Sequence, residues 1–86
     1  MVVKLEDLFI EQLEKCTTEF KNQFRTIYQQ LKIVEKPLEV KGIYRNNLNK
    51  KNYKLFIDKS RISLNFEDGV LIFACFYYNQ FFDSDN

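Results

Sequence analysis

The feature that most constrains this fold is a predicted β-hairpin within residues 61–78, which read RISLNFEDGVLIFACFYY. At its centre, Asp68-Gly69 is typical of a two-residue turn in which both central residues need positive φ. Such a turn fixes which residues face each other across the two strands. The predicted pairs are Glu67–Val70, Phe66–Leu71, Leu64–Phe73 and Ile62–Cys75 and, on the opposite face, Asn65–Ile72, Ser63–Ala74 and Arg61–Phe76, with Tyr78 diagonally beyond Phe76.

The second strand of this hairpin is apolar on both faces. Eleven of the thirteen residues that follow Gly69 are apolar or aromatic. A helix that spans a membrane needs about 20 such residues, so this run is too short for an anchor. Its β-branched and aromatic residues instead predict a buried strand that is central in a sheet or covered on both sides.

The N-terminal third has the periodicity of helices. Apolar residues recur every three or four positions between Leu5 and Leu31, which is the spacing of one helix face. One helix over that range would be about 40 Å long, which exceeds the width of a domain of this size. Threonines after Cys16 favour a break, and Thr17 or Thr18 can cap a second helix. The pattern therefore predicts a helical hairpin of residues 4–16 and 18–33.

Pro37 marks the change from helical to alternating patterns. Proline disfavours helix at the residue before it, and the strand-like segments LEVKGIY and YKLFID follow, separated by a loop at 46–52. We therefore predict one α+β domain over residues 1–86. Its N-terminal helical hairpin packs on a C-terminal antiparallel sheet of three or four strands.

Composition excludes several kinds of site. The chain has no histidine, and its two cysteines, Cys16 and Cys75, lie far apart. This argues against a zinc site, and no metal or other cofactor is expected. The thiols are predicted to be free, with a disulfide as the alternative. The first residues carry acids and no long apolar run, so no signal peptide is predicted and the expected location is the cytoplasm.

Positive charge gathers in the middle of the chain. The net charge is only +1, but residues 36–61 hold eight Lys and Arg against two acids, a local charge of +6. Such a segment can bind phosphates, and a solvated lysine-rich loop is the alternative. The candidate RNA-binding residues are Arg45, Lys50, Lys51 and Lys54.

The order and spacing of these segments resemble the RelE/ParE superfamily of bacterial toxins from toxin–antitoxin modules. The similarity runs over most of the chain. LFIEQLEKCTTEFKNQFRTIYQQL resembles the family's helical hairpin, and EKPLEVKG resembles its entry into the sheet. YKLFIDKSRISLNFEDGVLIFACFYY resembles its terminal strands, and the last strand is most similar to that of the YoeB branch.

The resemblance implies a toxin that a partner antitoxin neutralises. In the RelE and YoeB branches such a toxin cuts messenger RNA on the ribosome, where the RNA 2′-hydroxyl attacks the adjacent phosphate. Arg61 falls on the family's arginine and is implied to bind that phosphate. Tyr78 falls where the YoeB pattern has a histidine and is implied either to donate a proton or to stack on a base. Glu39 is the carboxylate nearest the family's base. The sequence departs from the pattern at Phe76, which replaces a basic residue, and at Asn79, which replaces a terminal tyrosine.

Three classes of function stay open from the sequence. The first is a ribosome-dependent, metal-independent endoribonuclease toxin, whose partners would be an antitoxin, the ribosome and messenger RNA. The second is a ParE-like toxin directed at DNA gyrase. The third is a protein-binding module without catalysis, such as a degenerate toxin relative, an immunity protein or a phage-encoded inhibitor. The aromatic segment 76–82 is a candidate surface for an antitoxin helix or for a second copy of the chain.

Overall fold

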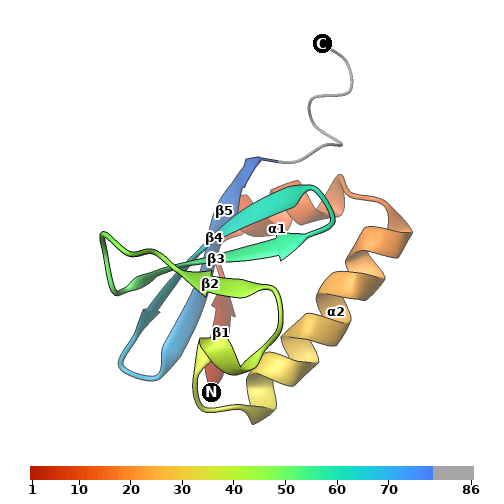
Figure 1. Ribbon diagram of the computed structural model, residues 1–86. Coiled ribbons are helices and arrows are strands. Elements are labelled where there is room, and N and C mark those ends of the chain that lie inside the picture. Colours follow the sequence, from red (N-terminus) through yellow and green to blue (C-terminus); the bar gives the residue numbers. More distant parts are fainter. Residues whose placement is uncertain (79–86) are drawn as a thin grey trace.

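A mixed β-sheet with two helices against one of its faces makes up the computed structural model, which describes residues 1–78 (Figure 1). The elements are β1 (Val2–Leu5), α1 (Asp7–Glu14), α2 (Thr18–Ile33), the short 3₁₀ helix η1 (Pro37–Glu39), β2 (Ile43–Arg45), β3 (Asn52–Ile57), β4 (Ser60–Glu67) and β5 (Val70–Tyr78). Within residues 1–78 the sheet has five strands in the order β1-β5-β4-β3-β2. β1 runs parallel to β5, and the other neighbours are antiparallel.

The N-terminal strand corrects three predictions. Within the described residues the sheet has five strands and not three or four, and it is mixed and not purely antiparallel because β1 runs parallel to β5. The first helix begins at Asp7 and ends at Glu14 instead of spanning residues 4–16. The physical reason is pairing with β5, which places Val3 and Leu5 against the core and leaves Lys4 exposed. Four residues with period two are too few to stand out beside the longer helical pattern that follows.

The predicted break between the helices is confirmed, and Thr17 is the residue that makes it. The Thr17 side chain accepts a hydrogen bond from the backbone N–H of Phe20 at 3.1 Å. This satisfies one of the N–H groups that the start of a helix leaves without an intrahelical partner. α2 then runs from Thr18 to Ile33, as predicted.

The predicted turn of the last hairpin is confirmed, but the register changes along it. Asp68 and Gly69 have φ of 54° and 77°, and the pairs match the prediction from Glu67–Val70 to Leu64–Phe73. Beyond that point the predicted pairs Ser63–Ala74, Ile62–Cys75 and Arg61–Phe76 are wrong. The structure pairs Ser63 with Cys75, Ile62 with Phe76 and Arg61 with Tyr78. Two β-bulges in β5 explain the shift, because Ala74 and Tyr77 are each an extra residue on that strand.

The bulges turn Phe76 into the core, where α1 holds it. Phe76 is 5% exposed and stacks on Phe9, with ring centroids 5.2 Å apart. The Gln12 side chain clasps the backbone of the same residue: Oε1 accepts from the Phe76 N–H at 2.8 Å, and Nε2 donates to its carbonyl at 3.5 Å. Where a bulge interrupts the strand ladder, a side-chain amide therefore serves as a hydrogen-bond partner for the strand.

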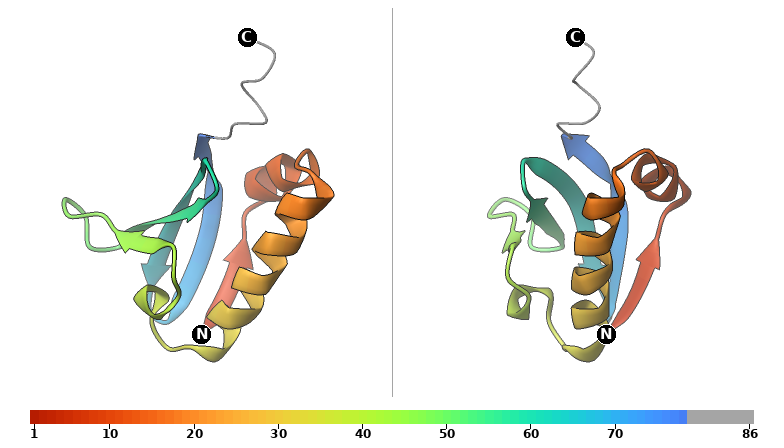
Figure 2. Two further views of the ribbon diagram at one scale, coloured as in Figure 1. Left: turned by 45° about the vertical axis from the view of Figure 1, so that its right-hand side comes forward. Right: turned by 90° about the vertical axis from the view of Figure 1, so that its right-hand side faces the viewer.

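Aromatic rings fill the space between the helices and the sheet. Phe9 of α1 lies 5.4 Å from Phe24 of α2 and 5.2 Å from Phe73 of β5, measured between ring centroids. Phe20 of α2 completes the cluster against Phe76 at 5.6 Å. Figure 2 shows both helices on this side of the sheet, and no helix of residues 1–78 covers the other side. The sheet therefore has a buried inner face and an open outer face.

Replacing Gln12 with leucine tests the clasp. Gln12→Leu keeps the volume of the side chain but removes both hydrogen bonds to Phe76. We expect it to lower the free energy of unfolding by about 1–3 kcal/mol, measured by urea denaturation. The matched control is Gln30→Leu on the exposed side of α2, where a change of no more than about 0.5 kcal/mol is expected. Equal effects of the two substitutions would contradict the clasp.

Alanine substitutions at two neighbouring threonines test the N-terminal cap of α2. Thr17→Ala should cost about 1 kcal/mol of stability, because it removes the acceptor for the Phe20 N–H. Thr18→Ala, one residue further into the helix, should cost much less. Thermal unfolding of both variants under the same conditions compares their stabilities. A larger loss of stability for Thr18→Ala than for Thr17→Ala would show that Thr17 is not the cap.

Candidate functional site

One row of side chains on the outer face joins two of the residues that the sequence singled out. Phe56 of β3 pairs with Arg61 of β4, and Arg61 pairs with Tyr78 of β5, so the three lie side by side across three strands. The Arg61 guanidinium carbon is 5.3 Å from the Phe56 ring centroid and 5.8 Å from that of Tyr78. Cation–π contacts to both rings hold the guanidinium on the sheet surface. Within residues 1–78 it makes no ion pair, so its donors can bind an anion.

The same row borders an open cavity of about 440 Å³ at the end of the β3–β4 hairpin. Asp58 and Lys59, the two turn residues, complete its lining beside Phe56, Arg61 and Tyr78. Asp58 adopts positive φ (52°), which the tight turn requires. The cavity thus combines a cation held between two rings with a carboxylate and an ammonium group at its rim.

Sequence analysis missed Phe56, Asp58 and Lys59, although a signal for them exists. If Asp58-Lys59 is taken as a two-residue turn like Asp68-Gly69, Phe56 falls directly opposite Arg61. Aspartate is also one of the few residues other than glycine that tolerates positive φ.

A second row lies next to the first on the outer face. Tyr44, Lys54, Ser63 and Cys75 face one another across β2, β3, β4 and β5. The Tyr44 ring is 5.3 Å from that of Phe56, which links the two rows. The Lys54 ammonium lies 5.7 Å from the centroid of the Tyr77 ring.

Tyr77 owes its position to the second bulge, and it is 46% exposed. Partial burial raises the pKa of its phenol above the ordinary value for tyrosine, and the positive charge of Arg61 opposes that rise. The Tyr77 hydroxyl therefore stays protonated at neutral pH.

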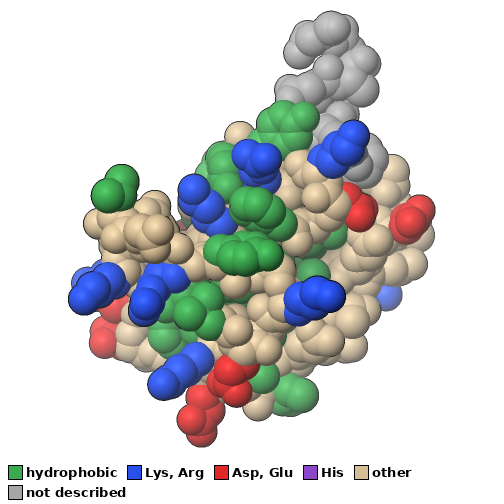
Figure 3. Space-filling model, in the orientation of Figure 1, with side chains coloured by type: hydrophobic (Ala, Val, Ile, Leu, Met, Phe, Trp, Pro, Cys, Tyr) green, Lys and Arg blue, Asp and Glu red, His purple; other side chains and the backbone are tan. Residues whose placement is uncertain are grey.

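The predicted RNA-binding residues divide into three environments. Lys54 stands on the outer face. Arg45 ends β2, and Lys50 lies in the loop before β3; both are exposed. Lys51 forms an exposed salt bridge with Glu67 at 2.7 Å, and this hydrogen bond raises the pKa of the lysine. In the view of Figure 3, Lys and Arg side chains are interspersed with hydrophobic ones over the strands.

Glu39, the predicted base, has a different set of contacts. Its Oε2 accepts hydrogen bonds from the backbone N–H groups of Glu35 at 3.1 Å and Lys36 at 2.9 Å. These bonds cap η1. Glu39 does not line the cavity beside Arg61, where Asp58 is the carboxylate. The structure thus brings Arg61 and Tyr78 together and leaves Glu39 outside that group.

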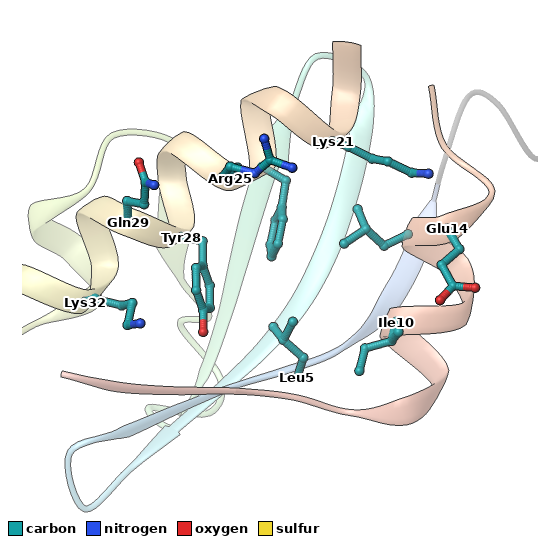
Figure 4. Close-up of a pocket in the computed structure, with 10 residues that line it drawn as sticks. Leu5, Ile10, Glu14, Lys21, Arg25, Tyr28, Gln29 and Lys32 are labelled. Atoms are coloured by element: carbon teal, nitrogen blue, oxygen red, sulfur yellow. The ribbon is translucent and has the colours of Figure 1, made fainter. Parts of the chain in front are cut away.

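A second concave surface lies between the helices, on the side of the sheet opposite the Arg61 cavity (Figure 4). This helix groove has a volume of about 610 Å³, and Leu5, Ile10, Leu13, Phe24 and Tyr28 contribute apolar side chains to it. The polar lining residues are Glu14, Lys21, Arg25, Gln29 and Lys32. All of these except Glu14 come from α2, so the groove is apolar with mainly basic charge along one helix.

The described residues give no sign of a metal site. Within residues 1–78, no three His, Cys, Asp or Glu side chains lie where they could together hold a metal ion. The free-thiol prediction is confirmed, with Cys16 buried and Cys75 half-buried. No helix in this part of the chain has the length and hydrophobicity to cross a membrane. The aromatic segment 76–82, predicted as an interface, is only partly described: Tyr77 and Tyr78 are exposed, but the prediction is wrong for Phe76, which is buried in the core. Residues 79–82 of that segment fall outside the described residues.

Comparison with known proteins places the fold. No protein-family model matches the sequence, and no curated protein sequence matches it. Among solved structures, a chain of the crystal structure of the RelB-RelE antitoxin-toxin complex from Methanococcus jannaschii is similar, with a TM-score of 0.75 and 13% sequence identity. The match covers 87% of this chain and 88% of that chain. At this identity the likeness shows a shared fold, and the resemblance noted in the sequence is supported at that level.

Proposed function

We propose that this chain is the toxin of a toxin–antitoxin pair and cuts messenger RNA on the ribosome. The observation that carries the proposal is the row Phe56–Arg61–Tyr78, in which a guanidinium without an ion-pair partner in residues 1–78 is held between two aromatic rings. The similar fold of a chain in an antitoxin-toxin complex supports the proposal that this protein belongs to a toxin–antitoxin pair.

The row suits a single-stranded RNA. Arg61 can bind a phosphate through two parallel hydrogen bonds, and its fixed charge then stabilises the extra negative charge of the transition state. Exposed rings such as Phe56 and Tyr78 provide stacking surfaces for the neighbouring bases. Lys59 at the cavity rim adds positive charge for a further phosphate.

The reaction also needs two proton transfers. The 2′-oxygen forms a bond to phosphorus while the bond from phosphorus to the 5′-oxygen breaks. In our proposal Tyr78 donates its proton to the departing 5′-oxygen. Asp58 accepts the proton of the 2′-hydroxyl, because its carboxylate lines the cavity with Arg61, whereas Glu39 is engaged in capping η1. Proton transfers of this kind contribute roughly 10²–10⁴ in rate.

The helix groove is the surface we assign to the antitoxin. An amphipathic helix fits an apolar groove, and acidic residues on it would complement Lys21, Arg25 and Lys32. The groove and the Arg61 cavity share no lining residue.

A second candidate is a protein-binding module without catalysis. The observation in its favour is the charge of the whole chain, which is only +1, because binding to ribosomal RNA depends strongly on positive charge. In that case the helix groove, and not the outer face, would be the functional surface.

Cell-free translation with the purified chain tests the proposed activity. Primer extension should reveal cleavage of messages under translation. Arg61→Ala should lower the cleavage rate by roughly 10²–10³, because it removes transition-state stabilisation. Tyr78→Phe should lower it by roughly 10² or more while RNA binding stays intact, because the ring remains and the proton donor is lost.

Arg25→Ala in the helix groove is the matched control and should cleave like the parent chain. Messages that stay intact while the parent chain is present would reject the nuclease. Normal translation in that experiment would favour the binding module, and a following gyrase assay would examine a ParE-like action.

A further inference from the structure

We propose that the outer face holds a subsite for one unpaired nucleobase, next to the phosphate-binding Arg61. The subsite is an open cavity of about 290 Å³ between β2, β3, β4 and β5. Its main side chains are Tyr77, Lys54, Ser63, Asn46, Asn52 and Cys75. This inference rests on the proposed RNA binding and adds to it a site that reads a base.

Tyr77 supplies the stacking surface. The second bulge of β5 makes it an extra residue between Phe76, which points into the core, and Tyr78, which pairs with Arg61. Its ring is nearly half exposed, and Lys54 lies against it. Every base has a π-face, so an exposed ring beside a lysine suits a base and its phosphate.

The lining also presents polar atoms to the edge of a base. Asn46 Oδ1 accepts a hydrogen bond from the Leu48 N–H at 2.8 Å, which directs its amide NH₂ away as a donor. The Ser63 hydroxyl and the Asn52 amide are only partly exposed and make no side-chain hydrogen bond within residues 1–78. Single-stranded RNA is commonly read by such groups together with a stacked ring.

The spacing connects this subsite to Arg61. Lys54 pairs with Ser63 and Phe56 pairs with Arg61, so the two rows are two residues apart along β3, roughly 7 Å. That separation is close to one nucleotide of an extended strand. A phosphate bound by Arg61 therefore places a neighbouring base at Tyr77. No acid of residues 1–78 lines the subsite.

The test measures binding of a short, 5′-labelled 2′-O-methyl oligoribonucleotide, which cannot be cleaved, by fluorescence polarisation. Tyr77→Ala should weaken binding roughly fivefold to 100-fold, the range for loss of one stacked base. Tyr77→Phe is the matched control and should stay within about twofold, because the ring is kept. A series of oligonucleotides, each abasic at one position, identifies the base that binds at Tyr77. With the parent chain, removal of that base should weaken binding to a similar degree. With Tyr77→Ala, removal of the same base should weaken binding no further.

Alkylation of Cys75 gives a second readout that needs no change at Tyr77. In a Cys16→Ala background, the same oligonucleotide should slow the reaction of Cys75 with iodoacetamide several-fold, and an oligonucleotide abasic at the identified position should not. This readout decides the matter if Tyr77→Ala does not fold, as judged by circular dichroism.

The outcomes separate the subsite from the wider proposal. If Arg61→Ala abolishes binding but Tyr77→Ala and every abasic position leave it unchanged, the subsite is wrong and RNA binding stands. If the parent chain does not bind the oligonucleotide at all, both are wrong.

Discussion

The clasp of Gln12 on the backbone of Phe76 is the contact on which both halves of the molecule depend. It holds β5 to α1 at the point where the strand carries its two bulges. With the bulges in place, Phe76 joins the aromatic core, and the following residues, Tyr77 and Tyr78, lie on the outer face. A regular strand would put Phe76 opposite Arg61 and remove the row that we propose binds RNA. Core packing and the candidate site therefore share one cause.

The sequence predicts what local patterns determine, and it misses what depends on distant contacts. The turn at Asp68-Gly69 and the helix break at Thr17 are confirmed because each depends on the conformational preferences of a few adjacent residues. The bulges are not visible in β5 itself, since they serve the fit of Phe76 against Phe9 and the clasp by Gln12. β1 was missed for the same reason: its strand conformation depends on pairing with β5, at the other end of the described chain.

The candidate site shows the same division. Arg61 and Tyr78 were predicted from a family resemblance, and the structure pairs them. Phe56 and Asp58 become visible only when the β3–β4 turn is placed, and Tyr77 only when the second bulge is known. The helix groove lies on the opposite side of the sheet from the two cavities of the outer face, so a partner in the helix groove would leave the outer face accessible unless part of that partner also wraps around the sheet edge.

The parallel pairing of β1 with β5 also has a consequence for synthesis. β1 is made before every other element of the described residues, but β5, which supplies its hydrogen-bond partners, is the last of these elements to be made. Contacts between such distant segments form late and slowly. The sheet can close, and Tyr78 can meet Arg61, only after β5 has left the exit tunnel. If the chain acts on ribosomes, each molecule therefore becomes active only after the ribosome that makes it has synthesised β5 and the sheet has closed.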